Sequence, residues 1–115
     1  MKNLYEILVP TIYGDSLKPI RTRHHKQWDE RVQSISGGLT ILAPAKGKWT
    51  YKGTEYPEKV IPVRIMCDDV QMMKIVNITL SHYRQKAVMY YVVSREVNIV
   101  TEPFRLGPEE HWMKK

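Results

Sequence analysis

The hydrophobic residues of this chain switch between two spacings, and the order of these switches constrains the fold more than any other feature. Residues 4–13 alternate well enough to predict a strand, with Tyr5, Ile7 and Val9 on one face. Residues 22–36 instead carry apolar side chains three to four positions apart, as an amphipathic helix does, and glycines follow. The chain therefore begins with a strand and then a helix.

The following part of the chain repeats this pattern after an additional strand. A short apolar run at 39–42 leads into an irregular hairpin, whose return strand is 60–66. Pro62 in this strand favours an edge position. Asp68 is a good N-cap for a second amphipathic helix, and the apolar run 87–93 then predicts a central strand buried on both faces.

The resulting order, βαββαβ, predicts an α+β fold of the ferredoxin-like kind, a split βαβ sandwich. Its sheet is antiparallel, both helices cover one face, and the other face is open. We expect residues 1–96 to form this single domain and residues 97–115 to form a C-terminal tail. We expect another subunit to cover the open face by packing on alternating side chains of the sheet: Tyr5, Arg64, Met89 and Tyr91.

Charge and cysteine content limit the class of protein. Eighteen Lys and Arg against twelve Asp and Glu give a formal charge of +6 at pH 7, which favours anionic partners without identifying one. The single cysteine, Cys67, excludes an intramolecular disulfide, and we expect it to be a small buried side chain. No apolar stretch has the length of a signal sequence or a membrane span, so we expect a cytoplasmic protein.

No sequence motif for a nucleotide, a dinucleotide or a metal occurs in the chain. His24 and His25 are adjacent and point to different faces of a helix, while His82 and His111 are remote in sequence. A metal ion needs ligands that converge, so we expect surface or capping histidines and no metal site.

Two segments could bind a ligand. Arg21 and Arg23 form a candidate anion patch at the start of a helix, although we favour a solvated helix edge there. The hairpin 46–59 combines aromatic residues, small residues and carboxylates, which suits a small amphipathic ligand. Its aromatic side chains could equally cover a core or an interface.

The segment 58–67, followed by the second helix and by 85–91, resembles the phage S-adenosylmethionine lyases, formerly named S-adenosylmethionine hydrolases. The similarity lies in pattern and spacing, without a single invariant motif. It extends upstream to the first strand, the Arg- and His-rich start of the first helix and the turn at 37–39, so it covers nearly the whole chain. The resemblance implies a homotrimer of ferredoxin-like subunits that binds S-adenosylmethionine between subunits.

The resemblance also implies a reaction. In these lyases the carboxylate of the substrate attacks its own γ carbon, which expels 5′-methylthioadenosine and leaves homoserine lactone. The protein then has to impose a near-attack geometry, and no metal or cofactor is implied. The activity would remove S-adenosylmethionine from restriction systems in the cytoplasm of a phage-infected host.

The resemblance places the site residues in the hairpin. Glu58 matches the functional glutamate of the family, and Tyr51 is assigned to its functional tyrosine across a gap, so both are predicted to be catalytic. We expect Glu58 to anchor the α-ammonium of the substrate, with an aromatic residue facing the adenine or the sulfonium. The predicted substrate-binding residues are Trp49, Tyr56 and Glu55.

The alternative is a basic, oligomeric binding module without catalysis. It would use Arg21, Arg23, Lys26 and the hairpin residues 46–52 to hold nucleic acid or a host defence protein. Nucleic acid is the less favoured of the predicted partners. The fold itself selects neither function, because many unrelated activities share it.

Overall fold

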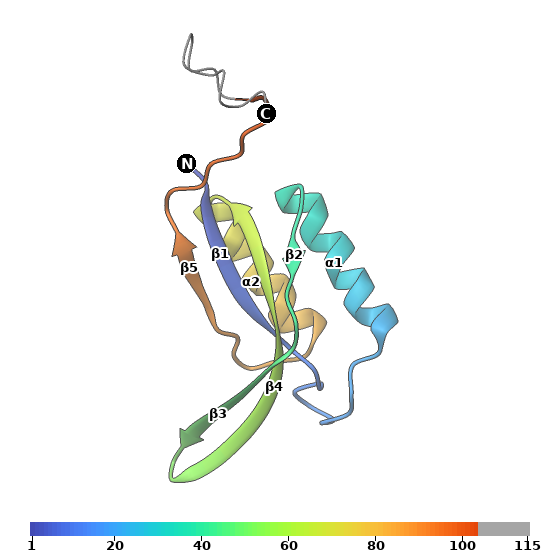
Figure 1. Ribbon diagram of the computed structural model, residues 1–115. Helices are drawn as coiled ribbons and strands as arrows, with labels where there is room; N and C mark the ends of the chain where they lie inside the picture. Colours follow the sequence, from blue (N-terminus) through green and yellow to red (C-terminus); the bar gives the residue numbers. More distant parts are fainter. Residues whose placement is uncertain (104–115) are drawn as a thin grey trace, which may run out of the picture.

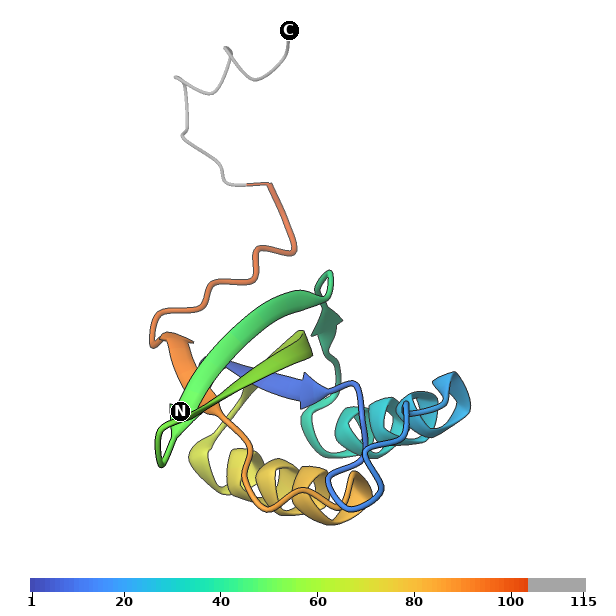
Figure 2. The same ribbon diagram turned by 90° about the horizontal axis from the view of Figure 1, so that it is seen from below.

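A computed structural model describes residues 1–103 and shows one antiparallel sheet with two helices packed on one of its faces (Figures 1 and 2). The elements follow in the order β1 (Asn3–Pro10), α1 (Thr22–Ser36), β2 (Thr40–Ile41), β3 (Ala45–Tyr51), β4 (Thr54–Cys67), α2 (Asp69–His82) and β5 (Tyr90–Ser94). This arrangement confirms the predicted ferredoxin-like α+β fold. From residue 104 onward, the predicted C-terminal tail lies outside the described residues.

The strands lie in the order β2-β4-β1-β5, and β3 pairs with β4 beyond β2. Strand β1 runs along β4 from Asn3, opposite Cys67, to Pro10, opposite Val60. The rest of β4 has only β3 as a neighbour, so these two strands leave the sheet together (Figure 1). They form the predicted hairpin.

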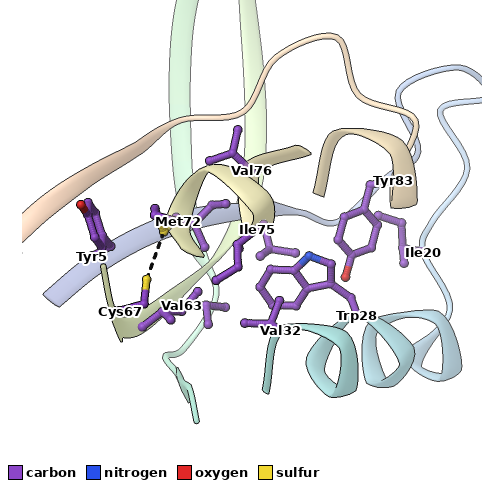
Figure 3. Close-up of a cluster of buried hydrophobic side chains, with 13 residues drawn as sticks. Tyr5, Ile20, Trp28, Val32, Val63, Cys67, Met72, Ile75, Val76 and Tyr83 are labelled. Carbon is purple, nitrogen blue, oxygen red and sulfur yellow. Dashed lines mark hydrogen bonds between the residues drawn. The ribbon is translucent and has the colours of Figure 1, made fainter. Parts of the chain in front are cut away.

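The core lies between the sheet and the helices. Tyr5, Ile7 and Val9 of β1 point into it, as their alternation predicts, and α1 contributes Trp28 and Val32. Figure 3 shows Tyr5, Trp28 and Val32 converging with the side chains of β4 and α2, which include Val63, Cys67, Met72, Ile75 and Val76. Each large apolar side chain buried in this way contributes roughly 1.5–3 kcal/mol to folding.

Tyr5 therefore does not lie on the open face, where we expected it to help bind another subunit. It is buried, and its hydroxyl donates a hydrogen bond to Asp69 at the start of α2. The physical reason is that successive side chains of a strand point to opposite faces, so Tyr5 points to the same face as Ile7 and Val9. Arg64 and Tyr91 do point to the open face, where they are opposite Glu6 in the sheet register.

The helix ends follow from local sequence. Asp68, the predicted N-cap, accepts a hydrogen bond from the amide of Gln71, and the Gln71 side chain accepts one from the amide of Asp68, which forms a capping box. Gly37 ends α1 in the left-handed conformation, at φ 88°. The N-cap of α1 is Arg21, and no side chain caps this end.

The edge position predicted for the strand of Pro62 is wrong, because β4 has neighbours on both sides. Pro62 lacks an amide proton, and its carbonyl accepts from the amide of Leu42 on the side of β2 and β3. That neighbouring chain is interrupted at 42–44, between β2 and β3. The sheet therefore needs no donor from Pro62 at this point.

The strand predicted over 87–93 is β5, which is shorter and is not central. It pairs with β1 alone, so it is an edge strand of the sheet. The side chains of its apolar run point to both faces of the sheet. Val92 packs against the core, whereas Tyr91 and Val93 are partly exposed on the other face. A run that is apolar on both faces does not require a strand on each side.

Candidate functional site

The hairpin forms an arm, defined here as residues 45–59, that projects beyond the ends of the helices (Figure 1). Seven cross-strand pairs, from Ala45 opposite Val60 to Tyr51 opposite Thr54, hold its two strands together. The two-residue turn is Lys52-Gly53, with φ of 50° and 78°. Positive φ at both positions is the geometry of a type I′ turn, which fixes the register of the strands.

This register sorts the side chains of the arm onto two sides. Directly opposed residues share a side, and the direction alternates along each strand. The aromatic side carries Trp49, Tyr51, Tyr56 and Glu58. The lysine side carries Lys46, Lys48, Lys59, Thr50, Glu55 and Pro57.

The aromatic side is exposed and ordered by ring contacts. The rings of Trp49 and Tyr56 are stacked, with centroids 4.8 Å apart and planes inclined by 23°, and the ring of Tyr51 lies 6.3 Å from Trp49. Trp49, Tyr51 and Tyr56 keep 49%, 53% and 41% of their surface exposed. Large aromatic side chains with this exposure are typical of an interaction surface.

A hollow of about 490 Å³ lies where the arm leaves the sheet. Gly47 is directly opposite Glu58, and a Cβ at Gly47 would lie 3.7 Å from Cγ of Glu58. The missing side chain leaves room beside this carboxylate. The hollow is lined by Lys46, Gly47, Lys48, Pro57, Glu58 and Lys59.

The aromatic side continues into the open face of the sheet, because alternate residues of β4 keep the same direction. On that face Glu6 is buried and accepts hydrogen bonds from Arg64, at 3.0 Å, and from the hydroxyl of Tyr91. These charges are thus paired within one chain. Around them lie partly exposed apolar side chains: Leu4, Leu8, Pro62 and Met66.

The structure separates the predicted site residues. Tyr51 and Glu58 share the aromatic side, but they are four positions of the register apart, which corresponds to about 13 Å. Glu55, predicted beside Trp49 and Tyr56, points to the lysine side and forms an ion pair with Lys48, at 3.6 Å. Within one chain these residues do not surround a common point.

Arg21 and Arg23 are exposed at the start of α1, close to the root of the arm. The hydroxyl of Thr11 donates to the carbonyl of Lys59, at 2.7 Å, and the carbonyl of Thr11 accepts from the amide of Ile20, at 3.0 Å. This pair of bonds connects the arm to the residue just before Arg21. No pattern in the sequence indicates this proximity.

Three of the histidines expected to be surface or capping residues, His24, His25 and His82, form a cluster between the helices, and His111 lies outside the described residues. The rings of His24 and His82 have centroids 3.9 Å apart, and His25 contacts the hydroxyl of Tyr83 at 2.7 Å. Burial lowers the pKa of both His25 and His82. Among residues 1–103, no group of three or more His, Cys, Asp or Glu side chains is placed to hold a metal ion.

The sequence-based interpretation also missed the pairing of Lys46 with Lys59. The signal was the dipeptide Lys52-Gly53, because a two-residue turn at this point sets every cross-strand pair of the arm.

None of the helices described in residues 1–103 is long and apolar enough to cross a membrane.

No protein-family model and no curated protein matches the sequence. Several solved structures are similar in fold. The periplasmic divalent cation tolerance protein CutA from Archaeoglobus fulgidus has a TM-score of 0.64 and 10% identity, with 86% of this chain and 88% of that chain covered. Cut A1 from Thermus thermophilus has a TM-score of 0.64 and 9% identity, with 85% of this chain and 88% of that chain covered. CutA from Xylella fastidiosa has a TM-score of 0.62 and 13% identity, with 85% of this chain and 86% of that chain covered.

These structural neighbours overturn the predicted membership of the S-adenosylmethionine lyases, because they are divalent cation tolerance proteins. The lyase activity, its substrate and products, and the phage anti-restriction role are overturned with it. The reason lies in what the resemblance rested on. Pattern and spacing of strands and helices are shared by any chain with this fold, whereas an activity needs specific site residues.

Proposed function

We propose that this protein is a non-catalytic, self-associating binding module, in which the open sheet face and the aromatic side of the arm form the contact between copies. One observation supports this most strongly. The arm is a two-stranded ribbon with no further strand beside it among residues 1–103, and it exposes Trp49, Tyr51 and Tyr56 on one side. An isolated ribbon of this kind is marginally stable in water, so a covering partner would stabilise it.

Charge supports a second copy of the chain as this partner. Two molecules that each carry +6 repel one another unless the surfaces that meet are close to neutral. On the open face, Glu6 and Arg64 neutralise each other within one chain, at 3.0 Å. The remainder of that face is largely apolar, as the core of a subunit interface is.

The geometry favours a closed ring. The aromatic side of the arm and the open sheet face are separate regions of one continuous surface, so a contact between the arm of one copy and the sheet of the next is heterologous. Heterologous contacts produce rings when the rotation closes. We propose the homotrimer that the sequence interpretation favours as this ring.

The structural neighbours are named for tolerance of divalent cations. We do not extend that property to this chain, because its described residues bring together no set of metal ligands.

We also propose a cytoplasmic location for the protein. A fluorescent fusion observed in living cells would test it.

The mass of the protein in solution tests self-association. We expect sedimentation velocity and light scattering to give three times the chain mass of 13.5 kDa for the wild type. Trp49→Ser combined with Tyr56→Ser should shift the protein to a smaller species, because the contact between copies loses its aromatic anchors. A matched control is Val70→Ser, which changes an exposed apolar residue of α2 and should leave the mass unchanged.

Two results would contradict the proposal. The first is a wild type that stays monomeric across the micromolar range of concentration. The second is an arm variant that is folded, with a wild-type far-UV circular dichroism spectrum, and still has the wild-type mass.

A further inference from the structure

We infer that the lysine side of the arm, together with the start of α1, binds the phosphate backbone of a nucleic-acid duplex. Lys46 and Lys59 are directly opposite each other in the ribbon, and Lys48 follows on the same side, two residues or about 7 Å from Lys46. All three side chains are exposed. The arm thus presents a compact group of positive charges on a projecting surface.

This arrangement has no explanation in the stability of the arm. Like charges directly opposite each other destabilise an antiparallel pair. Within residues 1–103, Lys46 and Lys59 form no ion pair, and only Lys48 has one, with Glu55 at 3.6 Å. A ribbon that already lacks neighbouring strands therefore carries an additional unfavourable interaction, which an anionic ligand would remove.

A second group of positive charge lies at the root of the arm. The helix α1 has no acidic residue in its first turn and no side-chain cap, so its first amide groups are available to an anion. Arg21 and Arg23 flank this end, and the bonds of Thr11 to Lys59 and Ile20 bring it close to the arm. The helix α1 lies on the helix-covered face of the sheet, and by alternation along β4 the lysine side of the arm continues that face, so one ligand can contact both groups.

The separation of the two sides of the arm identifies the ligand. Proteins that hold single strands combine positive charge with aromatic side chains on one surface, because the bases stack on the rings. Here the aromatic residues lie on the opposite side of the ribbon, so no ring of the arm is available next to the lysines. The lysine side can therefore neutralise phosphates but cannot stack bases, which suits an intact duplex.

An acidic protein fits this surface less well. Protein interfaces concentrate aromatic and other apolar residues at their centre and are depleted of lysine. The lysine side of the arm offers only Thr50, Pro57 and the ion-paired Glu55 besides its lysines. Contacts to phosphates alone carry no sequence information, so we expect binding that is independent of base sequence.

This inference rests on the proposed function in one respect. If copies meet through the aromatic side, each lysine side faces outward and one duplex can contact several arms. The two proposals nevertheless fail separately, because mass in solution reports the contact between copies and duplex affinity reports the lysines.

Fluorescence anisotropy with a labelled 20-base-pair DNA duplex tests the inference. If each chain contacts five phosphates, the affinity should fall about 500-fold between 50 mM and 200 mM salt through counterion release. The double variant Lys46→Gln and Lys59→Gln should bind more weakly and lower the salt slope by about 2. Its mass in solution should equal that of the wild type.

The matched control is Lys74→Gln combined with Lys86→Gln, which removes the same charge from exposed positions outside the arm. This control should retain most of the duplex affinity. Equal weakening by both double variants would indicate attraction by net charge alone and overturn the inference. So would tighter binding of a single strand than of the duplex, or equal binding of polyglutamate, which would indicate an acidic protein as the partner.

Discussion

The imidazole ring of His24 lies against that of His82, with centroids 3.9 Å apart and planes inclined by 35°. This contact joins the first turn of α1 to the last turn of α2. The Nε2 proton of His82 is donated to the carbonyl of His24, at 2.8 Å, and its Nδ1 accepts from the guanidinium of Arg31, at 3.1 Å. His82 is therefore held in its neutral form, since a proton on Nδ1 would face a donor that is already positively charged.

We predict that the fold loses stability when the pH falls below about 6.5. Burial lowers the pKa of His82 and of His25 below the ordinary value of 6.5, and the charges of neighbouring histidines add to this. Between the lowered pKa and 6.5, the unfolded chain binds more protons than the folded chain, so acidification favours unfolding. Above pH 6.5 these two groups contribute no pH dependence.

Urea unfolding at pH 7.5 and at pH 5.5 measures this effect. The urea midpoint of the wild type should be lower at pH 5.5, and His82→Gln should reduce the difference because glutamine does not titrate. A His82→Gln protein that keeps the full difference between the two pH values would show that other groups cause it.

A second prediction concerns the only buried indole of the described core. Nε1 of Trp28 donates to Oγ1 of Thr79 at 3.0 Å, and the Thr79 hydroxyl donates to the carbonyl of Ile75 at 2.6 Å. Thr79→Val keeps the shape but leaves the indole N–H without an acceptor, which should lower the free energy of unfolding by about 1–3 kcal/mol. Urea unfolding measures this change.

Two further proteins separate this hydrogen bond from packing. Thr79→Ser retains the hydroxyl and should be more stable than Thr79→Val, although it is smaller. In a Trp28→Phe background the cost of Thr79→Val should shrink, because no indole N–H remains to be satisfied. An identical cost in both backgrounds would show that this bond does not stabilise the core.

The parts of the fold that could be predicted are those fixed by residues close in sequence. The N-cap Asp68 of α2 and the glycine end of α1 depend on a few neighbouring positions, and both were predicted. The central position of β4 could not be predicted from Pro62. It depends on an interruption of the neighbouring chain at 42–44, which only the assembled sheet shows.

The candidate surfaces also contain some features that could be predicted from the sequence and others that could not. The two sides of the arm follow from the turn at Lys52-Gly53, so the register could have been deduced from the sequence. The proximity of His24 to His82 could not, because it requires the packing of two helices whose sequences give no pairing. The resemblance to a lyase family failed because shared spacing reports the fold rather than the activity.

Cys67 provides a third prediction, on reactivity. Its side chain is fully buried, and its thiol lies 4.0 Å from the sulfur of Met72 (Figure 3). Burial, with a further contribution from Asp68, raises the pKa of the thiol to about 11. Because the thiolate is the reactive form, the native protein should react very slowly with a thiol reagent at pH 8.

Absorbance during reaction with a disulfide reagent follows this directly. In concentrated urea, one thiol per chain should react with the reagent, because the chain has a single cysteine. Full labelling of the native protein at the rate of a free thiol would show that Cys67 is accessible, contrary to its place in the core.

The last prediction uses two glycines that differ in their surroundings. The amide of Gly14 donates to the carbonyl of Tyr83 at 3.3 Å, and a Cβ at Gly14 would lie 2.3 Å from the backbone oxygen of Arg84. The backbone of Arg84 cannot move away as a flexible side chain can, so Gly14→Ala should lower the free energy of unfolding by at least about 1–3 kcal/mol.

Gly38→Ala is the control, because a Cβ at Gly38 would meet no atom within 4 Å. Urea unfolding of both variants should show a large loss for the first and little change for the second. Equal stability of the two variants would mean that the loop after β1 does not pack against the end of α2 as described.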